Sequence, residues 1–353
     1  MKRKNQKSIF DKVLYIGPDI KGKGGISSVL ASYEKMIQNF HYVSSNSRKG
    51  TIMGVFALME LMLLLPYFGY LRGIKIVHIH GASRKSFVRK SLIIRFAKLM
   101  RRKVIFHCHG GEFKSYVAEA GESKVLNVLS KCDAIVVLSQ KWVDYFKNDL
   151  DLKNVIVINN IVEPAQSIVE NPMPAKELKL LFLGTICDNK GIFDLLDVIA
   201  VDKTEMIGRI KLYIGGNGEV ERLQSVILQK QLGEIVEYVG WVTGEDKKRL
   251  LKDCDIVMLP SYIEGLPISL LEAMAYAKPS ITTNVGGIPE IIESGKNGVI
   301  ITPGDKKALY EAIRLFMDNP QLIAEYGNEG LKRVKDFYPQ SVKVQLENLY
   351  KQL

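Results

Sequence analysis

The sequence is poor in cysteine, and the few that it has are scattered. They form no CxxC pair along the 353 residues, and they stand at Cys108, Cys132, Cys187 and Cys254. Disulfide frameworks and structural zinc sites use paired or closely spaced cysteines, so free thiols in a reducing compartment are expected instead. No internal repeat or low-complexity run is present, so repeat architectures are not expected.

The chain also lacks a long uninterrupted apolar run. Residues 54–71 are the most apolar stretch, but Glu60 and Pro66 interrupt them and no second candidate span accompanies them. Because a bilayer span needs about 20 apolar residues, we expect a buried or membrane-lying helix here. The basic start MKRKNQK is followed only by the short apolar run VLYIG, so a signal peptide is not expected.

What the chain does contain suits two α/β domains. Its length fits two domains of ordinary size, and hydrophobic residues make up 47% of it. Short apolar runs typical of buried strands alternate with helical patterns in both halves. They cover residues 13–17, 76–80, 104–109, 132–139, 155–159, 178–184, 210–218, 235–241 and 255–260. We therefore predict two doubly wound, Rossmann-like α/β domains that face each other across a cleft.

The domain boundary is predicted from proline. Residues 163–178 are proline-rich and are interpreted as a hinge, so the first domain is expected to span residues 1–165 and the second 166–335. Near the end of the second domain, residues 293–305 (ESGKNGVIITPGD) have the pattern of a hairpin.

The net charge of +11 is unevenly distributed. Residues 1–165 hold 27 Lys and Arg against 12 Asp and Glu, whereas the rest of the chain holds 22 against 26. The basic half predicts a polyanionic partner: a membrane, an anionic acceptor or nucleic acid. Residues 84–103 carry nine basic side chains, no acidic one and several apolar ones. That pattern is typical of a basic amphipathic helix on an anionic membrane, and a solvated crossover helix is the alternative.

The most informative stretch is residues 260–290, PSYIEGLPISLLEAMAYAKPSITTNVGGIPE. A buried strand is predicted to end here, a short loop carries Glu264, and a proline suits the start of the helix that follows. The free N–H groups of Ile268 and Ser269 then lie in the first turn, which attracts anions such as phosphate. Glu272 follows about one turn inside the helix. This point beyond the carboxyl end of a strand is where doubly wound sheets bind ligands.

The run EGLPISLLEAM, with GGIPEII after it, closely resembles the Glu-x7-Glu region of glycosyltransferase family 4. Members are retaining, nucleotide-sugar-dependent enzymes of the two-domain GT-B fold. The resemblance implies that Glu264 holds hydroxyls of the donor sugar, that Glu272 holds the ribose, and that Gly265 and Leu266 belong to the donor-binding loop. A surface glutamate and a helix-stabilising glutamate are the alternative. The resemblance also implies that a last helix, within residues 336–353, crosses back to the first domain.

Two glycine-containing loops extend the resemblance. Lys190, in TICDNKG, matches the family's lysine that binds the donor diphosphate; a surface lysine is the alternative. The family usually has arginine where Thr185 stands, so one expected cation is missing. Gly24 and Gly25 follow the strand predicted at residues 13–17, and the family has a Gly-Gly pair here beside the donor phosphate or the acceptor. A plain turn is the alternative.

Four histidines lie near the ends of two predicted parallel strands. His78 and His80 share one strand face, as do His107 and His109, so together they form a possible metal site with about four ligands. No carboxylate accompanies them at ligand spacing, and the simpler interpretation places His80 and His109 at the cleft with the other two packed inside. By resemblance, His109 in HGGEF matches a His-Gly that faces the donor sugar; a strand-end histidine without a site role is the alternative.

These observations predict a retaining glycosyltransferase that moves a sugar from a nucleotide-diphosphate donor to a hydroxyl of a saccharide or lipid-linked acceptor, in cell-surface polysaccharide synthesis. Glu264, Lys190 and His109 are expected at the reacting centre, with no cofactor and no metal. Asp253 and Asp255 spell a DxD sequence, but they stand at the entry to a buried strand and are interpreted as capping it. The expected location is the cytoplasm, peripherally at the inner face of the membrane.

Two other classes of protein stay open. One is a nucleotide-sugar epimerase on the GT-B fold, against which EGLPISLLE followed by AMA argues. The other is a basic membrane-binding or nucleic-acid-binding module without enzymatic activity. Because no aromatic stacking set or base-reading motif accompanies the charge, no nucleic-acid partner is expected.

Overall fold

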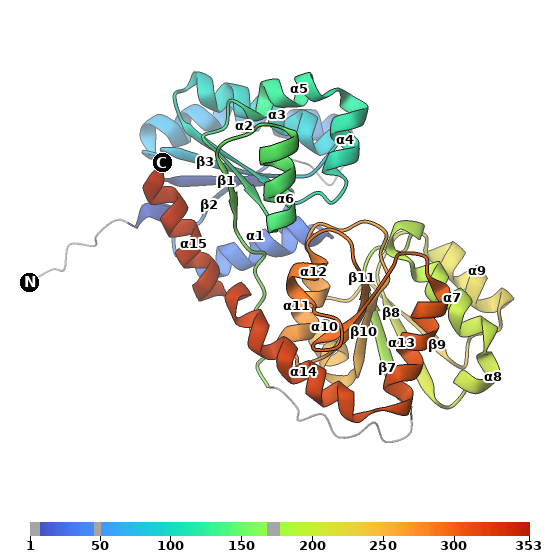
Figure 1. The fold of residues 1–353 in the computed structure, drawn as a ribbon. Helices are drawn as coiled ribbons and strands as arrows, with labels where there is room; N and C mark the ends of the chain where they lie inside the picture. The colour runs from blue at the N-terminus through green and yellow to red at the C-terminus, as the bar shows by residue number, and fades with distance from the viewer. Residues whose placement is uncertain (1–7, 46–50, 168–176) are drawn as a thin grey trace, which may run out of the picture. The chain divides into compact units, whose positions relative to one another are not determined.

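The computed structural model describes residues 8–45, 51–167 and 177–353, without the side chains of 51–58. The N-terminal residues 1–7 and most of the predicted hinge, residues 168–176, therefore lie outside the described part of the chain. The chain divides into two compact units (Figure 1). Unit 1 comprises Met1–Ile161 with Phe337–Leu353, and unit 2 comprises Val162–Asp336.

Unit 1 is built on a six-stranded parallel sheet of order β2-β1-β3-β4-β5-β6. All strands except β2 coincide with predicted apolar runs. The strands are β1 (Val13–Gly17), β2 (His41–Ser44), β3 (Ile76–Gly81), β4 (Lys103–Cys108), β5 (Ala134–Val137) and β6 (Val155–Val157). The strand order reverses between β1 and β3, and doubly wound sheets bind ligands at such a switch point.

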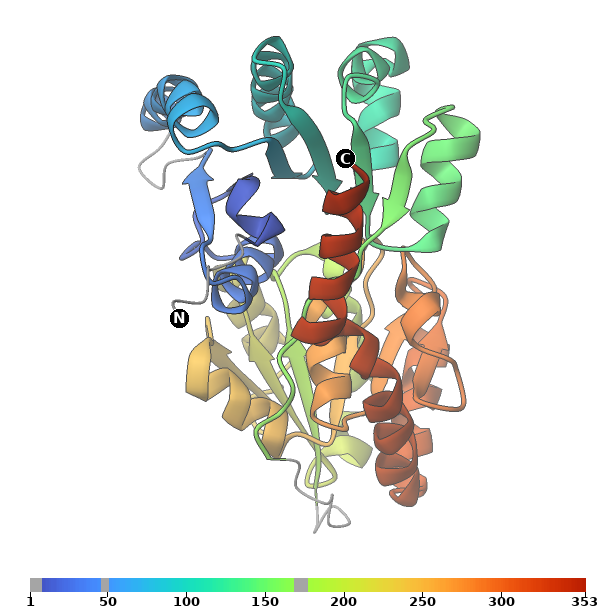
Figure 2. The same ribbon diagram turned by 90° about the vertical axis from the view of Figure 1, so that its left-hand side faces the viewer.

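Helices cover both faces of this sheet (Figure 1). They are α1 (Gly25–Met36), α2 (Thr51–Pro66), α3 (Lys85–Leu99), α4 (Phe113–Ala120), α5 (Glu122–Leu129), α6 (Gln140–Asp144) and α15 (Pro339–Gln352). Short helical turns cover Ile9–Lys12, Tyr67–Leu71 and Tyr145–Asp149. The C-terminal α15, red in Figure 2, packs on unit 1 through its buried Val342, Leu346, Leu349 and Tyr350.

Unit 2 has a second six-stranded parallel sheet, of order β12-β11-β10-β7-β8-β9. The strands are β7 (Leu178–Leu183), β8 (Ile210–Gly215), β9 (Val236–Gly240), β10 (Ile256–Leu259), β11 (Ser280–Thr283) and β12 (Gly298–Ile301). The order matches the Rossmann arrangement, and its switch point lies between β7 and β10. The predicted hairpin at residues 293–305 is wrong, because β12 pairs in parallel with β11.

The helices of unit 2 follow its strands in alternation. They are α7 (Ile192–Val201), α8 (Lys203–Met206), α9 (Val220–Gln229), α10 (Gly244–Asp253), α11 (Ile268–Ala275), α12 (Ile288–Ile291), α13 (Lys306–Asp318) and α14 (Gln321–Arg333), with short turns at Asp188–Lys190 and Val334–Phe337.

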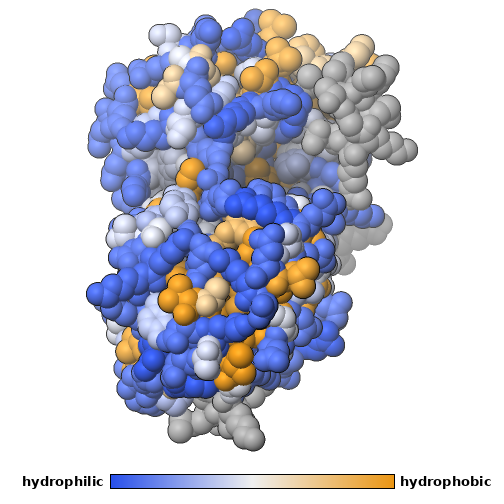
Figure 3. Space-filling view, turned by 90° about the vertical axis from the view of Figure 1, so that its right-hand side faces the viewer, coloured by the Kyte–Doolittle hydropathy of each residue, from blue (hydrophilic) through white to orange (hydrophobic). Residues whose placement is uncertain are grey.

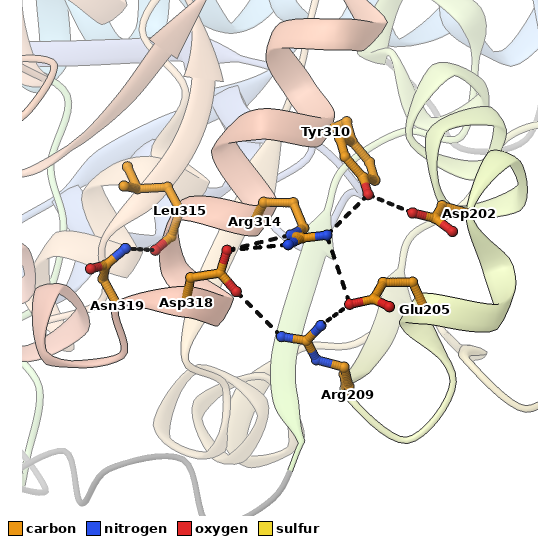
Figure 4. Close-up of polar contacts among 8 residues, drawn as sticks. All are labelled: Asp202, Glu205, Arg209, Tyr310, Arg314, Leu315, Asp318 and Asn319. Atoms are coloured by element: carbon orange, nitrogen blue, oxygen red, sulfur yellow. Dashed lines mark hydrogen bonds and ion pairs between the residues drawn. The ribbon is translucent and has the colours of Figure 1, made fainter.

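A polar network links α13 to the connection between β7 and β8 (Figure 4). Tyr310 Oη donates to Asp202 Oδ2 at 2.5 Å. Arg209 donates to Asp318 Oδ1 at 3.3 Å and also pairs with Glu205. These contacts are mostly exposed, so they fix the orientation of α13 more than they add stability.

Helix α3 has fewer available cations than its sequence indicates. Lys90 is 1% exposed, and its Nζ donates to Ser45 Oγ at 2.6 Å. Lys98 pairs with Asp133, and Arg84 pairs with carboxylates of α4 and its N-terminal end. The expectation that the basic residues of this segment lie on its surface is therefore wrong for Lys90, because its side chain is buried and a hydroxyl accepts a hydrogen bond from its amine.

Helix α2, which overlaps the apolar residues 54–71, is partly exposed. Leu61 and Leu65 are buried in the core of unit 1, whereas Leu63 is 79% exposed. Within the described residues, no helix has both the length and the apolar character needed to cross a bilayer.

Replacing Lys90 by methionine tests the burial of its amine. Burial lowers the pKa of Lys90 from 10.5 to about 7. Between these values the unfolded chain binds more protons than the folded chain, so wild-type stability rises with pH. Below about pH 7 the buried amine is charged, so the folded state bears the full free-energy cost of burying that charge. Lys90→Met removes this cost and fills a similar volume.

We expect Lys90→Met to raise the thermal midpoint of unfolding near pH 7 by several degrees, since about 1 kcal/mol is worth about 2–4 °C in a domain of this size. The advantage should shrink near pH 10. The control variant is Lys85→Met, because Lys85 is exposed on the same helix. It should neither raise the thermal midpoint near pH 7 nor change the dependence of the midpoint on pH. An effect of Lys90→Met that does not vary with pH would contradict a buried, titrating amine.

Candidate active site

The loops after β7 and β10 meet at the switch point of the unit 2 sheet. Lys190 ends the short turn after β7, and Glu264 lies in the loop after β10. Lys190 Nζ donates to Glu264 Oε1 at 2.5 Å, and Ser261 Oγ donates to the same oxygen at 2.8 Å. Glu264 is only 9% exposed, so its charge needs this cation and this hydroxyl to offset the loss of water.

Two glycines allow the loops to approach so closely. Gly191 has φ +66°, and a Cβ there would lie 2.0 Å from the carbonyl oxygen of Pro260. Gly286, in the GGIPE run, has φ +55°, and a Cβ there would lie 2.2 Å from the carbonyl oxygen of Glu264. Neither the backbone conformation nor the space admits a side chain at these positions. The backbone contacts therefore fix the loops that carry Lys190 and Glu264.

Helix α11 begins four residues after Glu264. The first-turn N–H groups of an α-helix have no partner inside the helix, so the amides of Ile268 and Ser269 are oriented to bind an anion. Glu272 lies one turn further along. Its carboxylate accepts a hydrogen bond from Lys247 Nζ of α10, which orients it.

The remaining residues of the predicted donor-binding loop differ in accessibility. Gly265 is half-buried, whereas the Leu266 side chain is 5% exposed and packs inside, so only its backbone can face a ligand. Thr185, where an arginine is usual by resemblance, is exposed after β7. Asp255 lies at the opposite end of β10, where its Oδ2 accepts the N–H of Lys179 at 2.7 Å. This contact ties Asp255 to the start of β7, and the interpretation of the two aspartates as a cap stays a prediction.

The other three predicted site residues belong to unit 1. Gly24 precedes α1 with φ 148°, Gly25 opens that helix, and both are exposed. His109 follows β4, and its Nε2 lies 2.9 Å from Nδ1 of His80. Burial lowers the pKa of His109, which keeps its imidazole neutral. The prediction that His80 lies at the cleft is wrong: it is fully buried on β3, whereas His109 is partly exposed.

Sequence reasoning missed three residues that shape the site. Ser261 and Lys247 each bind one of the two glutamates, and Arg222 of α9 binds Asp188 through two hydrogen bonds of 2.9 and 2.8 Å. Arg222 also lies 3.8 Å from the centre of the Phe193 ring. A serine after a proline and cations in highly charged helices resemble ordinary surface residues, so only the fold identifies them.

Known structures define the class of this fold. HepE of Anabaena, in complex with UDP-glucose, superposes with a TM-score of 0.77 at 16% identity, over 97% of this chain and 99% of HepE. At this identity the likeness shows the fold alone, and that fold is GT-B: two Rossmann-like domains, each with one parallel sheet.

The sequence comparisons then identify a family model and relatives. Residues 165–333 match the family model described as glycosyl transferases group 1. The putative colanic acid biosynthesis glycosyltransferase WcaL of Salmonella typhimurium is 28% identical over 184 residues, which are 50% of this chain and 45% of WcaL.

A Campylobacter jejuni protein is 27% identical over 213 residues, 60% of this chain and 58% of its own length. Its name is GalNAc-alpha-(1->4)-GalNAc-alpha-(1->3)-diNAcBac-PP-undecaprenol alpha-1,4-N-acetyl-D-galactosaminyltransferase. The chain thus spans about half the length of these curated relatives. It has the GT-B fold, and its second unit matches the group 1 glycosyltransferases.

Replacing Gly191 by alanine tests whether the backbone contact holds the site. Gly208 is the matched control, because its φ of +73° is similar but nothing lies within 4 Å of an added Cβ. Both substitutions cost about 1 kcal/mol for a left-handed residue. Only Gly191→Ala adds the clash with Pro260, for about 1–3 kcal/mol more. We expect the thermal midpoint of Gly191→Ala to fall well below that of Gly208→Ala. Equal midpoints would show that the two loops can move apart without loss of stability, so the backbone contact would not hold the site.

Proposed function

We propose that the protein is a retaining glycosyltransferase that moves a sugar from a nucleotide-diphosphate donor to a hydroxyl of a saccharide or lipid-linked acceptor. The observation that carries the proposal is the Lys190–Glu264 pair at the switch point of unit 2, beside the first turn of α11. A cation next to free helix amides suits a diphosphate, and an oriented carboxylate beside them suits sugar hydroxyls.

The leaving group of this reaction is a nucleoside diphosphate. As the glycosidic bond breaks, negative charge grows on the β-phosphate, and Lys190 with the amides of Ile268 and Ser269 would offset that growth. These groups are held before the donor arrives, and preorganised electrostatics of this kind is usually the largest catalytic effect. With Thr185 in place of an arginine, Lys190 carries more of the task.

Glu264 would accept hydroxyl groups of the donor sugar through its second oxygen, since Oε1 already binds Lys190 and Ser261. A carboxylate engaged in this way positions the sugar and is not directed at the anomeric carbon. We therefore propose that the acceptor attacks on the face that the leaving group departs from, without a covalent enzyme intermediate.

The remaining site residues have supporting roles in this proposal. Glu272, oriented by Lys247, would hold the ribose hydroxyls. The neutral His109 would face the donor sugar from unit 1, and the open backbone at Gly24 and Gly25 would lie beside the phosphate or the acceptor.

Kinetics of a Lys190→Ala variant test the proposed function. The donor is first found by measuring diphosphate release from uridine and guanosine diphosphate sugars; UDP is bound in structures of HepE, which makes it the first choice. We expect Lys190→Ala to lower kcat about 100-fold or more, comparable with the loss of one oxyanion donor. The control is Lys307→Ala, which breaks an exposed pair with Glu311 in the same unit.

A kcat within threefold of wild type in Lys190→Ala would contradict the assignment of the leaving-group site. The product distinguishes the alternative on the same fold: transfer yields a glycosylated acceptor, whereas an epimerase yields an altered sugar without any acceptor.

We further propose that the acceptor is presented at an anionic membrane, at the inner face of the cell membrane, in cell-surface polysaccharide synthesis. The name of the Campylobacter jejuni relative contains an undecaprenol-linked saccharide, and that of WcaL contains colanic acid biosynthesis. In unit 1, α2 and its following turn expose Met59, Leu63, Tyr67, Tyr70 and Leu71, and α3 exposes Val88, Leu92 and Leu99. In Figure 3, apolar side chains show along the upper rim, on unit 1, and others are scattered over unit 2.

Three exposed cations accompany these apolar side chains: Lys85 and Arg95 on α3, and Arg101 just after it. Each contributes about 1 kcal/mol near an anionic leaflet, less when salt screens it. Replacing all three by glutamine should reduce binding to phosphatidylglycerol vesicles about 100-fold at low salt, in a sedimentation assay.

The matched control replaces Lys124, Lys131 and Lys147, which are also exposed in unit 1, and changes the net charge equally. It should leave vesicle binding close to wild type. If both triple variants lose binding equally, only net charge matters, and the α2–α3 surface is not the docking face.

A further inference from the structure

Four histidines are stacked in unit 1, and three of them have no part in the proposed transfer. We call His78, His80, His107 and His109 the histidine stack. Ring centroids of His78 and His80 lie 4.6 Å apart, and those of His107 and His109 lie 4.2 Å apart. His78, His80 and His107 are fully buried on β3 and β4. Three polar rings in an apolar core need a reason, since burying polar groups is costly unless they are satisfied.

The nitrogens of these three residues converge. Nε2 of His78 lies 3.2 Å from Nδ1 of His107, and one ring nitrogen from each of the three residues lies within 4.8 Å of the others. A tetrahedral zinc ion with bonds of about 2.0–2.1 Å holds its nitrogen ligands about 3.4 Å apart. One pair already has this separation, and a side-chain adjustment of His80 brings the third nitrogen to it.

The second ring nitrogens of His78 and His80 make hydrogen bonds, as is usual for histidines that bind a metal. Nδ1 of His78 lies 2.7 Å from the hydroxyl of Tyr350, which donates in turn to the hydroxyl of Tyr15 at 2.9 Å. Nδ1 of His80 lies 2.9 Å from Nε2 of His109. Such second contacts fix the tautomer and the ring plane of a ligating histidine.

Unsatisfied polar atoms remain inside the stack. Nε2 of His80, Nε2 of His107 and the hydroxyl of Tyr33 are buried and have no hydrogen-bond partner among the described residues. The ring of Tyr33 lies against that of His80, with centroids 5.6 Å apart. A bound group that accepts a lone pair and carries a water molecule would engage Nε2 of His80 and the hydroxyl of Tyr33.

The positive charge of Lys90 acts on the stack and opposes a cation there. Burial lowers the pKa of Lys90 to about 7, so near neutral pH part of the protein carries an uncharged amine, which weakens that opposition.

We propose that His78, His80 and His107 form a buried site for a divalent transition-metal ion of the zinc class. The ligands are Nε2 of His78, Nε2 of His80 and Nδ1 of His107, with a water molecule in the fourth position. Three imidazoles and a water form a known ligand set for zinc, and imidazole also suits cobalt, nickel and copper. The proposed ligands belong to unit 1, whereas the donor-binding loops, where no metal is expected, belong to unit 2.

The bound ion would join α15 to the sheet of unit 1. Tyr350 belongs to α15 and contacts the His78 ring, so the ion, β3, β4 and the last helix form one connected group. Because the ligands are fully buried, the ion would enter during folding, and its binding energy would contribute to folding.

The experiment refolds the full chain with Zn²⁺ or Co²⁺, removes free metal by gel filtration, and measures bound metal by mass spectrometry. We expect about one ion per chain, a tetrahedral cobalt absorption band and a higher thermal midpoint than in the chelator-treated protein. His41, the remaining histidine of the chain, provides the control: His41→Gln should bind as wild type does, and His107→Gln should bind no ion.

A second variant keeps the proposal testable if His107→Gln does not fold. Tyr350→Phe keeps all three ligands and removes only the outer hydroxyl, so its metal affinity should fall about 10–100-fold in competition with a chelator. Wild-type protein that retains no metal and shows no thermal shift would overturn the proposal, and so would equal binding by wild type and His107→Gln. The stack would then be a hydrogen-bonded core that at most holds water.

Discussion

The contact between Lys190 and the buried Glu264 is the interaction on which the proposed donor site depends. A carboxylate that is 9% exposed is strongly destabilising unless a cation and hydrogen bonds compensate it, so removal of Lys190 leaves a buried, uncompensated charge. The glycines at 191 and 286 bring the backbones close enough for the contact to form. The same pair that satisfies the core of unit 2 therefore also presents a lysine and an oriented carboxylate at the carboxyl edge of its sheet.

Unit 1 accommodates buried polar groups differently from unit 2. It encloses Lys90 and the histidine stack without pairing them with opposite charges. Lys90 binds a serine hydroxyl, and the histidine stack is satisfied mainly by its own members and by Tyr350 of α15. The last helix, which follows unit 2 in sequence, thereby supplies a hydrogen bond inside unit 1. A polar interior of this kind stabilises little by itself but makes the packing specific.

Sequence patterns predicted the two parallel sheets, and they predicted the strand, loop and helix around Glu264, because short apolar runs and a proline at a helix start are local signals. They missed β11, whose Thr282 and Thr283 are buried because their hydroxyls bind the carbonyls of Leu259 and Ser261. A hydropathy pattern carries no information about these hydrogen bonds, so it does not predict that the two threonines are buried. Lys90 was misjudged for the same reason, since its burial depends on tertiary neighbours. The roles of the individual site residues remain predictions.

A crystal structure with bound uridine diphosphate tests the central claim most directly. If Lys190 and the start of α11 bind the donor, the diphosphate will lie within hydrogen-bond distance, about 3 Å, of Lys190 Nζ and of the first amides of α11. The ribose hydroxyls will then lie on Glu272. Lys190 would then bridge the phosphate and Glu264. A diphosphate bound away from these groups, with the Lys190–Glu264 contact unchanged, would contradict the account.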